Sequence, residues 1–346
     1  MTRRKIYIAH TGGTIGMRRT ERGFEPAADS LRAKLDRWIE RAGDDLPEVT
    51  FHESDPLLDS SNMTPADWHA LAEDLAANAA THDGFLVLHG TDTMTYTASA
   101  LSFMLENLNK PVLLTGSQIP IGEMRSDGRD NIVTALSLLN RHADRIAEVC
   151  ICFGESLMRG NRTTKTDATG LAAFESPNLP PLGSIGIRFD LDWSRIRGPR
   201  ADAPPLNVRP MGGSSVGAVR LYPGMRAEAL DGFLGGVDGL VLEGYGSGNG
   251  PGRNTEMMEV LRAATDAGKV IVVVTQPLRG SADLKRYGTG RALADAGVTG
   301  GFDMTAEAAL TKLTYLLACE SDPAVVRRLC QEDLRGELTL PTADSE

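Results

Sequence analysis

The chain has 346 residues, of which 41% are apolar and 24% are charged, and its formal net charge is −10 at pH 7. This length is more than one compact core usually holds, so we expect two domains. The acidic balance argues against a nucleic-acid partner, because phosphate binding needs a basic surface. An aromatic content of 5% also disfavours a platform for stacking bases.

The N-terminal segment resembles neither a secretory signal nor a membrane anchor. The basic residues Arg3, Arg4 and Lys5 are followed by an apolar run, Ile6–Ala9, that is shorter than the hydrophobic region of a signal peptide. Because we find no uninterrupted apolar run long enough to span a bilayer, we expect no membrane partner. The expected location is the cytoplasm.

The cysteines agree with that location. Cys150 and Cys152 alternate along an expected strand and therefore share one face of it. A C-x-C spacing alone is typical of neither a redox motif nor a zinc site. We interpret these two residues, together with Cys319 and Cys330, as buried free thiols in a reducing compartment.

In the first half of the chain, short apolar runs alternate with helical patterns. Strands are expected at Lys5–His10, Gly84–His89, Pro111–Thr115 and Glu148–Phe153. Helices are expected from Pro65, with Thr64 as N-cap and Asp67 closing a capping box, and over about 94–109 and 129–143. This alternation predicts an α/β fold with a mostly parallel sheet flanked by helices.

The pattern breaks near residues 176–214, where prolines and glycines accumulate without a long period. Strands then resume at Val216–Leu221, Gly239–Leu242 and Lys269–Val274, with helices at about 254–267 and 304–319. We therefore predict a larger N-terminal catalytic α/β domain over 1–190, a linker over 191–214, and a smaller C-terminal α/β domain over 215–346. Ligands of such sheets bind beyond the carboxyl ends of strands, a condition met by residues just after His10, His89 and Thr115.

The first expected strand runs into the glycine-rich turn Thr11–Gly16, of sequence TGGTIG. Adjacent glycines at 12 and 13 permit backbone conformations and close approaches that side chains forbid. A dinucleotide-binding loop is disfavoured, because glycines at 12, 13 and 16 do not fit G-x-G-x-x-G. On this motif alone, a plain tight turn and a turn that presents the Thr14 hydroxyl as a nucleophile both stay open.

The second expected strand is followed by the polar cluster His89–Thr93, of sequence HGTDT. Asp92 would lie near a helix N-terminus, where a helix cap is the structural alternative. A lone histidine such as His89 is more often a satisfied, partly buried residue than a base. A polar cluster at the end of one strand, combined with a hydroxyl turn at the end of another, nevertheless indicates an active site.

A third segment, RGNRTTK, ends at Lys165. Its structural alternative is a solvated basic loop. Its functional interpretation places Lys165 near Asp92, because a lysine held by a carboxylate and partly desolvated can shuttle a proton or polarise a hydroxyl.

Together, TGGTIG and GFLVLHGTDTM resemble the two signature segments of the bacterial-type L-asparaginases. Further segments, among them DSSNMTP, TGSQIP, RGNRTTK and DMTAEAALTKL, resemble the type I, cytoplasmic branch. The resemblance extends over roughly residues 4–337. It implies a larger N-terminal and a smaller C-terminal α/β domain.

The resemblance also implies roles for individual residues. Thr14 matches the family's nucleophile. The family's triad of a second threonine, an aspartate and a lysine corresponds to Thr91, Asp92 and Lys165. No metal and no cofactor is required by this chemistry, and the sequence shows no metal-ligand spacing.

The implied substrate is L-asparagine. Ser60, within Asp59-Ser60-Ser61, matches the serine that binds the substrate's α-carboxylate, so this segment is expected in the binding site together with Thr91. Asp92 also matches the carboxylate that holds the α-ammonium group. Asn249 matches an asparagine contributed across a subunit interface, which implies self-association as intimate dimers and a homotetramer.

The implied reaction is hydrolysis of the side-chain amide. Thr14 attacks, ammonia leaves and an aspartyl ester forms on Thr14; water oriented through Thr91 and Lys165 then releases L-aspartate. The backbone N–H groups of Thr14 and Thr91 are candidate donors to the oxyanion. One extra methylene is a modest difference, so a minor L-glutaminase activity is expected.

The chain departs from the family at two places. Residues 17–31 resemble a mobile lid, in which many members carry a tyrosine that bonds to the nucleophile; here the aligned residue is Phe24, which cannot relay a proton. Thr20 and Tyr315 are candidate substitutes, although Tyr315 is better explained as a core residue. Where some type I enzymes use an arginine for activation by asparagine, this chain has Glu243, so we predict that this regulation is absent or altered.

Two alternatives stay open at this point. The amidase subunit of a tRNA-dependent amidotransferase resembles the same family, but it is expected to carry an additional N-terminal domain, and the acidic balance disfavours a tRNA partner. A non-catalytic amino-acid-binding relative is disfavoured because Thr14, Thr91, Asp92 and Lys165 are all retained.

Overall fold

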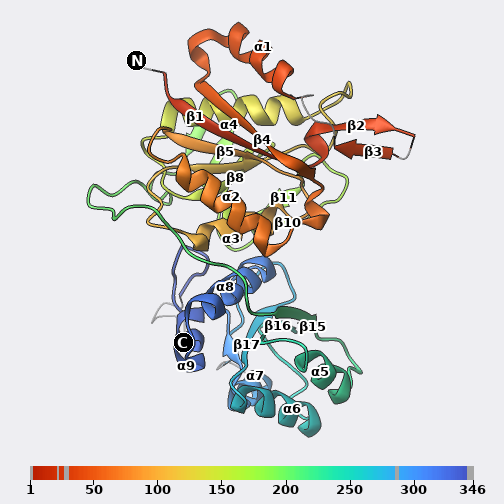
Figure 1. The fold of residues 1–346 in the computed structure, drawn as a ribbon. Helices are drawn as coiled ribbons and strands as arrows, with labels where there is room; N and C mark the ends of the chain where they lie inside the picture. The colour runs from red at the N-terminus through yellow and green to blue at the C-terminus, as the bar shows by residue number, and fades with distance from the viewer. Residues whose placement is uncertain (1–2, 22, 27–30, 285–287, 341–346) are drawn as a thin grey trace. The chain divides into compact units, whose positions relative to one another are not determined.

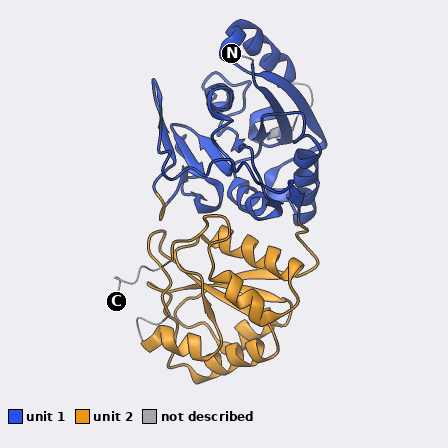
Figure 2. Cartoon of the chain, turned by 90° about the vertical axis from the view of Figure 1, so that its left-hand side faces the viewer, with its two compact units in different colours: residues 1–176, 180–208 blue, residues 177–179, 209–346 orange. Residues whose placement is uncertain are grey.

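The computed structural model describes residues 3–21, 23–26, 31–284 and 288–340, without the side chains of residues 24 and 26. The chain forms two compact units (Figure 2). Unit 1 comprises Met1–Ser176 and Pro180–Val208, and unit 2 comprises Pro177–Leu179 and Arg209–Glu346. No helix among the described residues is both long and apolar enough to cross a membrane.

Unit 1 is built around a sheet that has eight strands within the described residues, in the order β13-β12-β9-β8-β7-β5-β1-β4. The strands β4, β1, β5, β7 and β8 are parallel neighbours, and β9, β12 and β13 extend the sheet in antiparallel fashion. Their bounds are β1 (Lys5–Gly12), β4 (Glu48–Leu58), β5 (Gly84–Leu88), β7 (Val112–Thr115), β8 (Val149–Phe153), β9 (Ser156–Arg159), β12 (Gly183–Ile185) and β13 (Phe189–Leu191).

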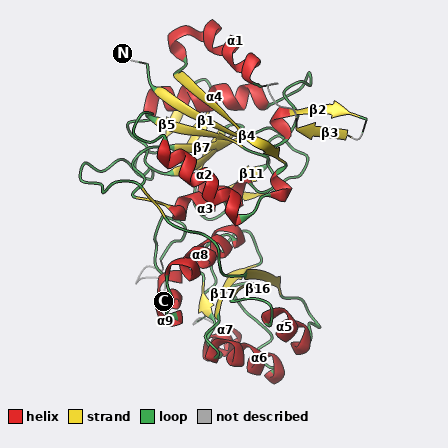
Figure 3. Cartoon of the chain, in the orientation of Figure 1, coloured by secondary structure: helices red, strands yellow, loops and turns green. Residues whose placement is uncertain are grey.

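Helices cover both faces of this sheet (Figures 1 and 3). They are α1 (Arg32–Ala42), α2 (Pro65–Ala77), α3 (Met94–Met104) and α4 (Gly128–His142). On β1, Ile6 and Ile8 join the core cluster that contains Leu136 of α4, whereas the hydroxyl of Tyr7 donates to Asp74 of α2 at 2.8 Å. Because successive side chains of a strand point to opposite faces, a strand covered on both sides has apolar residues at consecutive positions, as Ile6–Ala9 does.

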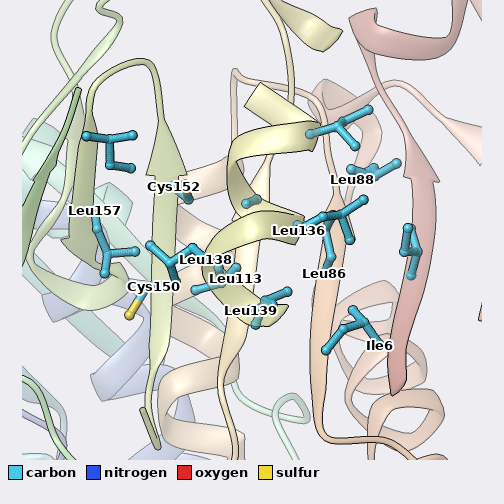
Figure 4. Packing of buried hydrophobic residues seen from close by; sticks show 14 of the residues in the cluster. Ile6, Leu86, Leu88, Leu113, Leu136, Leu138, Leu139, Cys150, Cys152 and Leu157 are labelled. Atoms are coloured by element: carbon cyan, nitrogen blue, oxygen red, sulfur yellow. The ribbon is translucent and has the colours of Figure 1, made fainter. Parts of the chain in front are cut away.

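The cluster between the sheet and α4 also contains Cys150 and Cys152, which lie on the same face of β8 as expected (Figure 4). Both thiols are free and buried, and burial raises the pKa of Cys152 to about 12. Cys330 is also buried and free. Cys319 is a free thiol as expected, but it is only half-buried.

Unit 2 is a smaller α/β unit with a parallel sheet in the order β15-β16-β17-β18. Its strands are β15 (Val216–Arg220), β16 (Gly239–Gly244), β17 (Val270–Thr275) and β18 (Thr299–Gly300). Its helices are α5 (Ala227–Leu234), α6 (Thr255–Asp266), α7 (Gly288–Asp295), α8 (Ala306–Cys319) and α9 (Pro323–Cys330). The predicted fold class, a larger N-terminal and a smaller C-terminal α/β domain, is confirmed.

The capping box expected at the start of α2 is present, since the Asp67 carboxylate accepts the backbone N–H of Thr64 at 2.7 Å. The helix predicted over 94–109 ends earlier than expected, at Met104. The C-cap Leu105 has a ψ of 74°, which is not helical, and the chain enters the short strand β6 (Leu105–Glu106).

Two short strand pairs were not expected from the sequence. The strand β6 pairs with β14 (Asn207–Val208), which falls within the expected linker 191–214 and belongs to unit 1. The segment expected as a lid contains a hairpin of β2 (Met17–Thr20) and β3 (Gly23–Pro26). The rest of that segment includes residue 22 and residues 27–30, which lie outside the described residues.

Candidate active site

The candidate site lies at the carboxyl edge of the parallel strands of unit 1. The loops after β1, β4 and β5 meet there because two glycines let their backbones touch. The backbone N–H of Gly13 donates to Leu58 at 2.9 Å, and a Cβ on Gly13 would lie 2.3 Å from the Cα atom of Gly90. Gly12 and Gly13 have φ values of 121° and 84°, which favour glycine. The TGGT turn therefore specifies a close approach between strand ends.

Thr14 comes directly after this contact and begins a 3-10 turn, Thr14–Gly16. It is half-buried, next to the backbone that leads into Thr91. Within the described part of the chain, the Thr14 hydroxyl has no hydrogen-bond partner. A half-buried hydroxyl without a protein partner at a strand end is available to a ligand.

His89 is buried, and both of its ring nitrogens form hydrogen bonds. This agrees with its interpretation as a satisfied structural histidine. Its Nδ1 bonds to the carbonyl of Gly90 at 2.7 Å, and its Nε2 bonds to the hydroxyl of Thr97 at 2.8 Å. Because a carbonyl only accepts, Nδ1 carries the proton and Nε2 accepts from Thr97. Burial lowers the pKa of His89 to about 4, so the ring is neutral at pH 7. His89 shapes the turn that holds Thr91 and is not placed as a base.

The segment Asp59–Ser61 lies against the same turn. Ser60 is buried, and a Cβ on Gly90 would lie 2.4 Å from its Oγ atom. The carbonyl of Ser60 accepts the hydroxyl of Thr93 at 2.7 Å. Asp59 accepts the backbone N–H and hydroxyl of Ser61 at 3.0 and 2.9 Å, which fixes the shape of the segment.

Lys165 lies in β10 (Thr164–Lys165), which pairs with β11 (Phe174–Glu175). Its Nζ atom donates to the hydroxyl of Thr91 at 2.9 Å and to the carboxylate of Asp92 at 2.7 Å. The Asp92 side chain is 65% exposed and does not cap α3, whose N-cap is Thr93. The structure thus brings Thr91, Asp92 and Lys165 into direct contact across 73 positions of sequence.

Gln118 belongs to this cluster, and we had not singled it out from the sequence. The hydroxyl of Thr91 donates to its Oε1 atom at 2.9 Å. Gln118 lies just after the carboxyl end of β7 at Thr115. Ligands of such sheets bind beyond the carboxyl ends of strands, so the sequence did indicate this region as part of the site.

The sequence suggested Thr20 and Tyr315 as residues that could assist Thr14 in place of Phe24, and neither forms a hydrogen bond with Thr14 among the described residues. Thr20 closes the β2–β3 hairpin by donating to the carbonyl of Gly23 at 2.9 Å. The side chain of Phe24 lies outside the described residues. Tyr315 is buried on α8 of unit 2, as its structural explanation predicted.

Glu243 and Asn249 lie in unit 2. Glu243 is near the end of β16, and Asn249 follows that strand. Asn249 forms a bridge with Tyr245, and its side-chain oxygen accepts the hydroxyl of Thr289 at 2.8 Å. Glu243 lies 3.8 Å from Arg220. Among the described residues, no group of three or more histidine, cysteine, aspartate or glutamate side chains could hold a metal ion.

Comparison with known protein families gives matches over most of the chain. Residues 5–197 match the N-terminal asparaginase domain, and residues 215–329 match the glutaminase/asparaginase C-terminal domain. The chain belongs to the asparaginase family. The family's two domain models fall on the two α/β units, so the site at the edge of unit 1 lies in an asparaginase N-terminal domain.

Individual relatives agree with this assignment. The chain is 48% identical to L-asparaginase 1 of Escherichia coli, over 98% of this chain and 99% of the relative. It is 41% identical to the 60 kDa lysophospholipase of Mus musculus, over 99% of this chain and 64% of that protein. The crystal structure of L-asparaginase I from Vibrio cholerae superposes with a TM-score of 0.90 at 46% identity, covering 98% of this chain and all of that one. The resemblance noted from the two signature segments is confirmed.

Proposed function

We propose that this asparaginase-family chain hydrolyses the side-chain amide of L-asparagine to L-aspartate and ammonia. The observation that carries the proposal is the contact of Lys165 with both Thr91 and Asp92, beside the turn that presents Thr14. The similarity to L-asparaginase 1 over nearly the full length of both chains supports the substrate.

We propose Thr14 as the nucleophile. Its Oγ1 atom attacks the amide carbon, the C–N bond breaks, and ammonia leaves with the proton from the hydroxyl, which leaves an aspartyl ester on Thr14. Water then attacks the ester carbon, aspartate leaves, and the hydroxyl of Thr14 is restored. Since the half-buried Thr14 has no hydrogen-bond partner among the described residues, its proton is free to be drawn toward the cluster of Thr91 and Lys165 as the attack proceeds.

The second step is assigned to the triad. Thr91 contacts the ammonium of Lys165, which polarises the hydroxyl and orients it for hydrogen bonding with the attacking water. Asp92 is the proposed holder of the substrate's α-ammonium group, and its 65% exposed carboxylate is open to a ligand. The buried Ser60 is proposed to bind the substrate's α-carboxylate, and its neighbours Asp59 and Ser61 are proposed to belong to the same substrate-binding segment.

We further propose a cytoplasmic homotetramer built from intimate dimers, with Asn249 contributed across the subunit interface. A minor L-glutaminase activity is expected, because a hydrophobic or steric difference of one methylene gives discrimination of only about 10- to 200-fold. An amidotransferase subunit and a non-catalytic binding protein are not favoured, because the chain keeps the contacts of Lys165 with Thr91 and Asp92 and is similar to L-asparaginase 1 over nearly the full length of both chains.

The test is ammonia release from L-asparagine, L-glutamine and both D-isomers. Wild-type enzyme is expected to prefer L-asparagine, and Thr14→Ala is expected to lose roughly a thousandfold or more of kcat. Thr81→Ala, at an exposed threonine near the end of α2, is the matched control and retains full activity. Absence of ammonia release by the wild type, or full activity of Thr14→Ala, would disprove the proposal.

A further inference from the structure

Gln118 forms a bridge between two parts of the candidate site. Its Oε1 atom accepts the hydroxyl of Thr91 at 2.9 Å, and its Nε2 atom donates to the carbonyl of Gly170 at 3.0 Å. Gly170 lies in the loop that joins β10 to β11, and β10 carries Lys165. Gln118 therefore contacts one member of the triad directly and the loop that follows another.

Both ends of this bridge are anchored. The backbone N–H of Gln118 donates to the carboxylate of Asp127 at 3.1 Å, just before α4 begins. In the other loop, the Asp167 carboxylate accepts the backbone N–H groups of Thr169 and Gly170 at 2.7 and 2.8 Å. These hydrogen bonds, that of Gly170 first, hold the pKa of Asp167 below its ordinary value. The carbonyl of Gly170 is thus presented at a fixed position.

The anchored loop fixes the orientation of the Gln118 amide. A backbone carbonyl can only accept a hydrogen bond, so the amide nitrogen must face Gly170 and the amide oxygen must face Thr91. An amide oxygen also only accepts, so Thr91 must donate its hydroxyl proton to Gln118. The direction of this hydrogen bond follows from the partners and needs no observed hydrogen.

The Lys165 ammonium sets the other side of Thr91. It has donors only, so Thr91 accepts from it. A hydroxyl has one proton and two lone pairs. With the proton committed to Gln118 and one lone pair to Lys165, a single lone pair of Thr91 is left for a third partner, and that partner must be a donor such as water or the Thr14 hydroxyl.

We propose that Gln118 is a positioning residue that holds Thr91 in this polarity, as a hydrogen-bond acceptor toward the reacting water. Without the amide oxygen, the Thr91 hydroxyl rotates and can donate to the water or to the substrate, in which case it no longer draws a proton from the attacking group. This inference rests on the proposed function, and it assigns to Gln118 an effect on the turnover step and not on substrate binding.

The first test compares Gln118→Met with wild type. Methionine is of similar size and cannot replace the strong amide acceptor. We expect kcat to fall at least tenfold while KM stays within about threefold, and the aspartyl ester to accumulate on the enzyme during turnover, detected by mass spectrometry after acid quenching. Gln331→Met, at an exposed position after α9, is the control and keeps the wild-type kcat.

The second test uses Gln118→Glu and a pH series. A protonated glutamic acid reproduces both hydrogen bonds, since its O–H donates to Gly170 and its carbonyl oxygen accepts from Thr91. An ionised carboxylate places an oxygen against the Gly170 carbonyl, and the repulsion between these two oxygens moves the side chain away from its position beside Thr91. The ratio of kcat for Gln118→Glu to that of wild type is therefore expected to rise several-fold as the pH falls through the titration of the introduced carboxyl group. If Gln118 served substrate binding only, KM would change with pH and this ratio of kcat values would stay flat.

The outcomes separate this inference from the proposed function. If wild type releases no ammonia from L-asparagine, the proposed function fails. If wild type is active and Thr91→Val is inactive, but Gln118→Met stays within twofold of the wild-type kcat, or the Gln118→Glu ratio does not change with pH, then the positioning role alone is overturned. The pH series decides the matter even if the methionine variant does not fold.

Discussion

A lysine in short contact with a carboxylate occurs in both units of this chain, and the two pairs have opposite surroundings. In unit 2, the side chains of Lys312 and Glu337 are 1% and 0% exposed, with Nζ and Oε1 2.5 Å apart. In unit 1, Lys165 is 18% exposed and Asp92 is 65% exposed. Burial costs a charged pair several kcal/mol of desolvation per ion, so only the first pair depends on complete internal compensation.

The hydrogen bonds of the two ammonium groups differ accordingly. Lys312 also donates to the carbonyls of Cys330 and Glu332, at 3.1 and 2.6 Å, so its three hydrogens all have protein partners. Burial alone would raise the pKa of the Glu337 carboxyl, but the charge of Lys312 holds it below its ordinary value. Lys165 instead contacts a hydroxyl and an exposed carboxylate. A lysine–carboxylate pair that is buried with all its hydrogen bonds satisfied serves the fold, whereas the half-open pair of Lys165 and Asp92 leaves its carboxylate accessible to a ligand.

The largest effect should come from the exposed pair. Lys165→Met removes the donor to Thr91 and Asp92, and we expect kcat for L-asparagine to fall about 100- to 10,000-fold. Stability should change by less than about 1 kcal/mol, because the Asp92 carboxylate of this pair is exposed to solvent and such ion pairs contribute little. Steady-state kinetics together with urea unfolding check both parts. A Lys165→Met variant that is active, or inactive only because it is unfolded, would contradict the contrast between the pairs.

The buried pair should show the reverse behaviour. Lys312→Met leaves the Glu337 carboxylate buried without its counter-ion, and we expect a loss of about 3–5 kcal/mol in the free energy of unfolding. Activity per folded molecule should persist. The double variant Lys312→Met, Glu337→Leu should recover much of the stability, because both charges are gone. Equal destabilisation of the single and double variants would show that the pair is not what matters there.

A smaller effect is expected from His89, whose buried ring supports the turn of the exposed pair. Its pKa of about 4 lies below the ordinary value of 6.5, so as the pH falls between these values the unfolded chain binds a proton that the folded chain does not. Stability is therefore lost with falling pH, by up to about 3 kcal/mol from this residue. Burial also lowers the pKa of His10, which acts in the same direction.

The measurement for His89 is the free energy of unfolding at pH 7 and pH 4.5. The difference between these values should be smaller for His89→Gln than for wild type. His69→Gln, on the surface of α2, serves as the control and should keep the wild-type difference. If His89→Gln shows the full wild-type loss, the buried neutral histidine is not a source of acid sensitivity.

The smallest effect concerns the carboxyl end of β16 in unit 2, where Glu243 lies beside Arg220. Because a carboxylate repels the carboxylate of a free amino acid, we expect no activation by asparagine and a hyperbolic dependence of velocity on its concentration, with a Hill coefficient of about 1. A sigmoidal curve that disappears when a residue near Glu243 is changed would refute this. The side chains at this strand end are already engaged with the backbone, as Gln276 donates to the carbonyls of Leu221 and Glu243.

Strands covered on both faces were predictable from sequence, because β1 and β5 each contain a run of consecutive apolar residues. The strand β4 was not predicted: it lies at the sheet edge, its residues are exposed or half-buried, and it mixes charged with apolar residues. The hairpin of β2 and β3 was also missed, since its exposed arginines give the composition of a loop.

Some residues of the candidate site were predictable from the sequence and others were not. Thr14, Thr91 and Asp92 follow strand ends, and local sequence motifs mark all three. Gln118 also follows a strand, but its importance depends on a carbonyl 52 positions away, at Gly170. A backbone carbonyl has no residue signature, so no reading of side chains could have paired it with this glutamine.

The role of Thr14 as the nucleophile is tested most sharply by a search for the covalent intermediate. Wild-type enzyme mixed with L-asparagine is quenched in acid within one turnover, digested and analysed by mass spectrometry. We predict an aspartyl ester on the peptide that contains Thr14, and no such ester in Thr14→Ala. In Lys165→Met, the amount of ester divided by the rate of turnover should be larger than in the wild type. An ester on another residue, or ammonia release at the wild-type rate by Thr14→Ala, would contradict the assignment of Thr14 as the nucleophile.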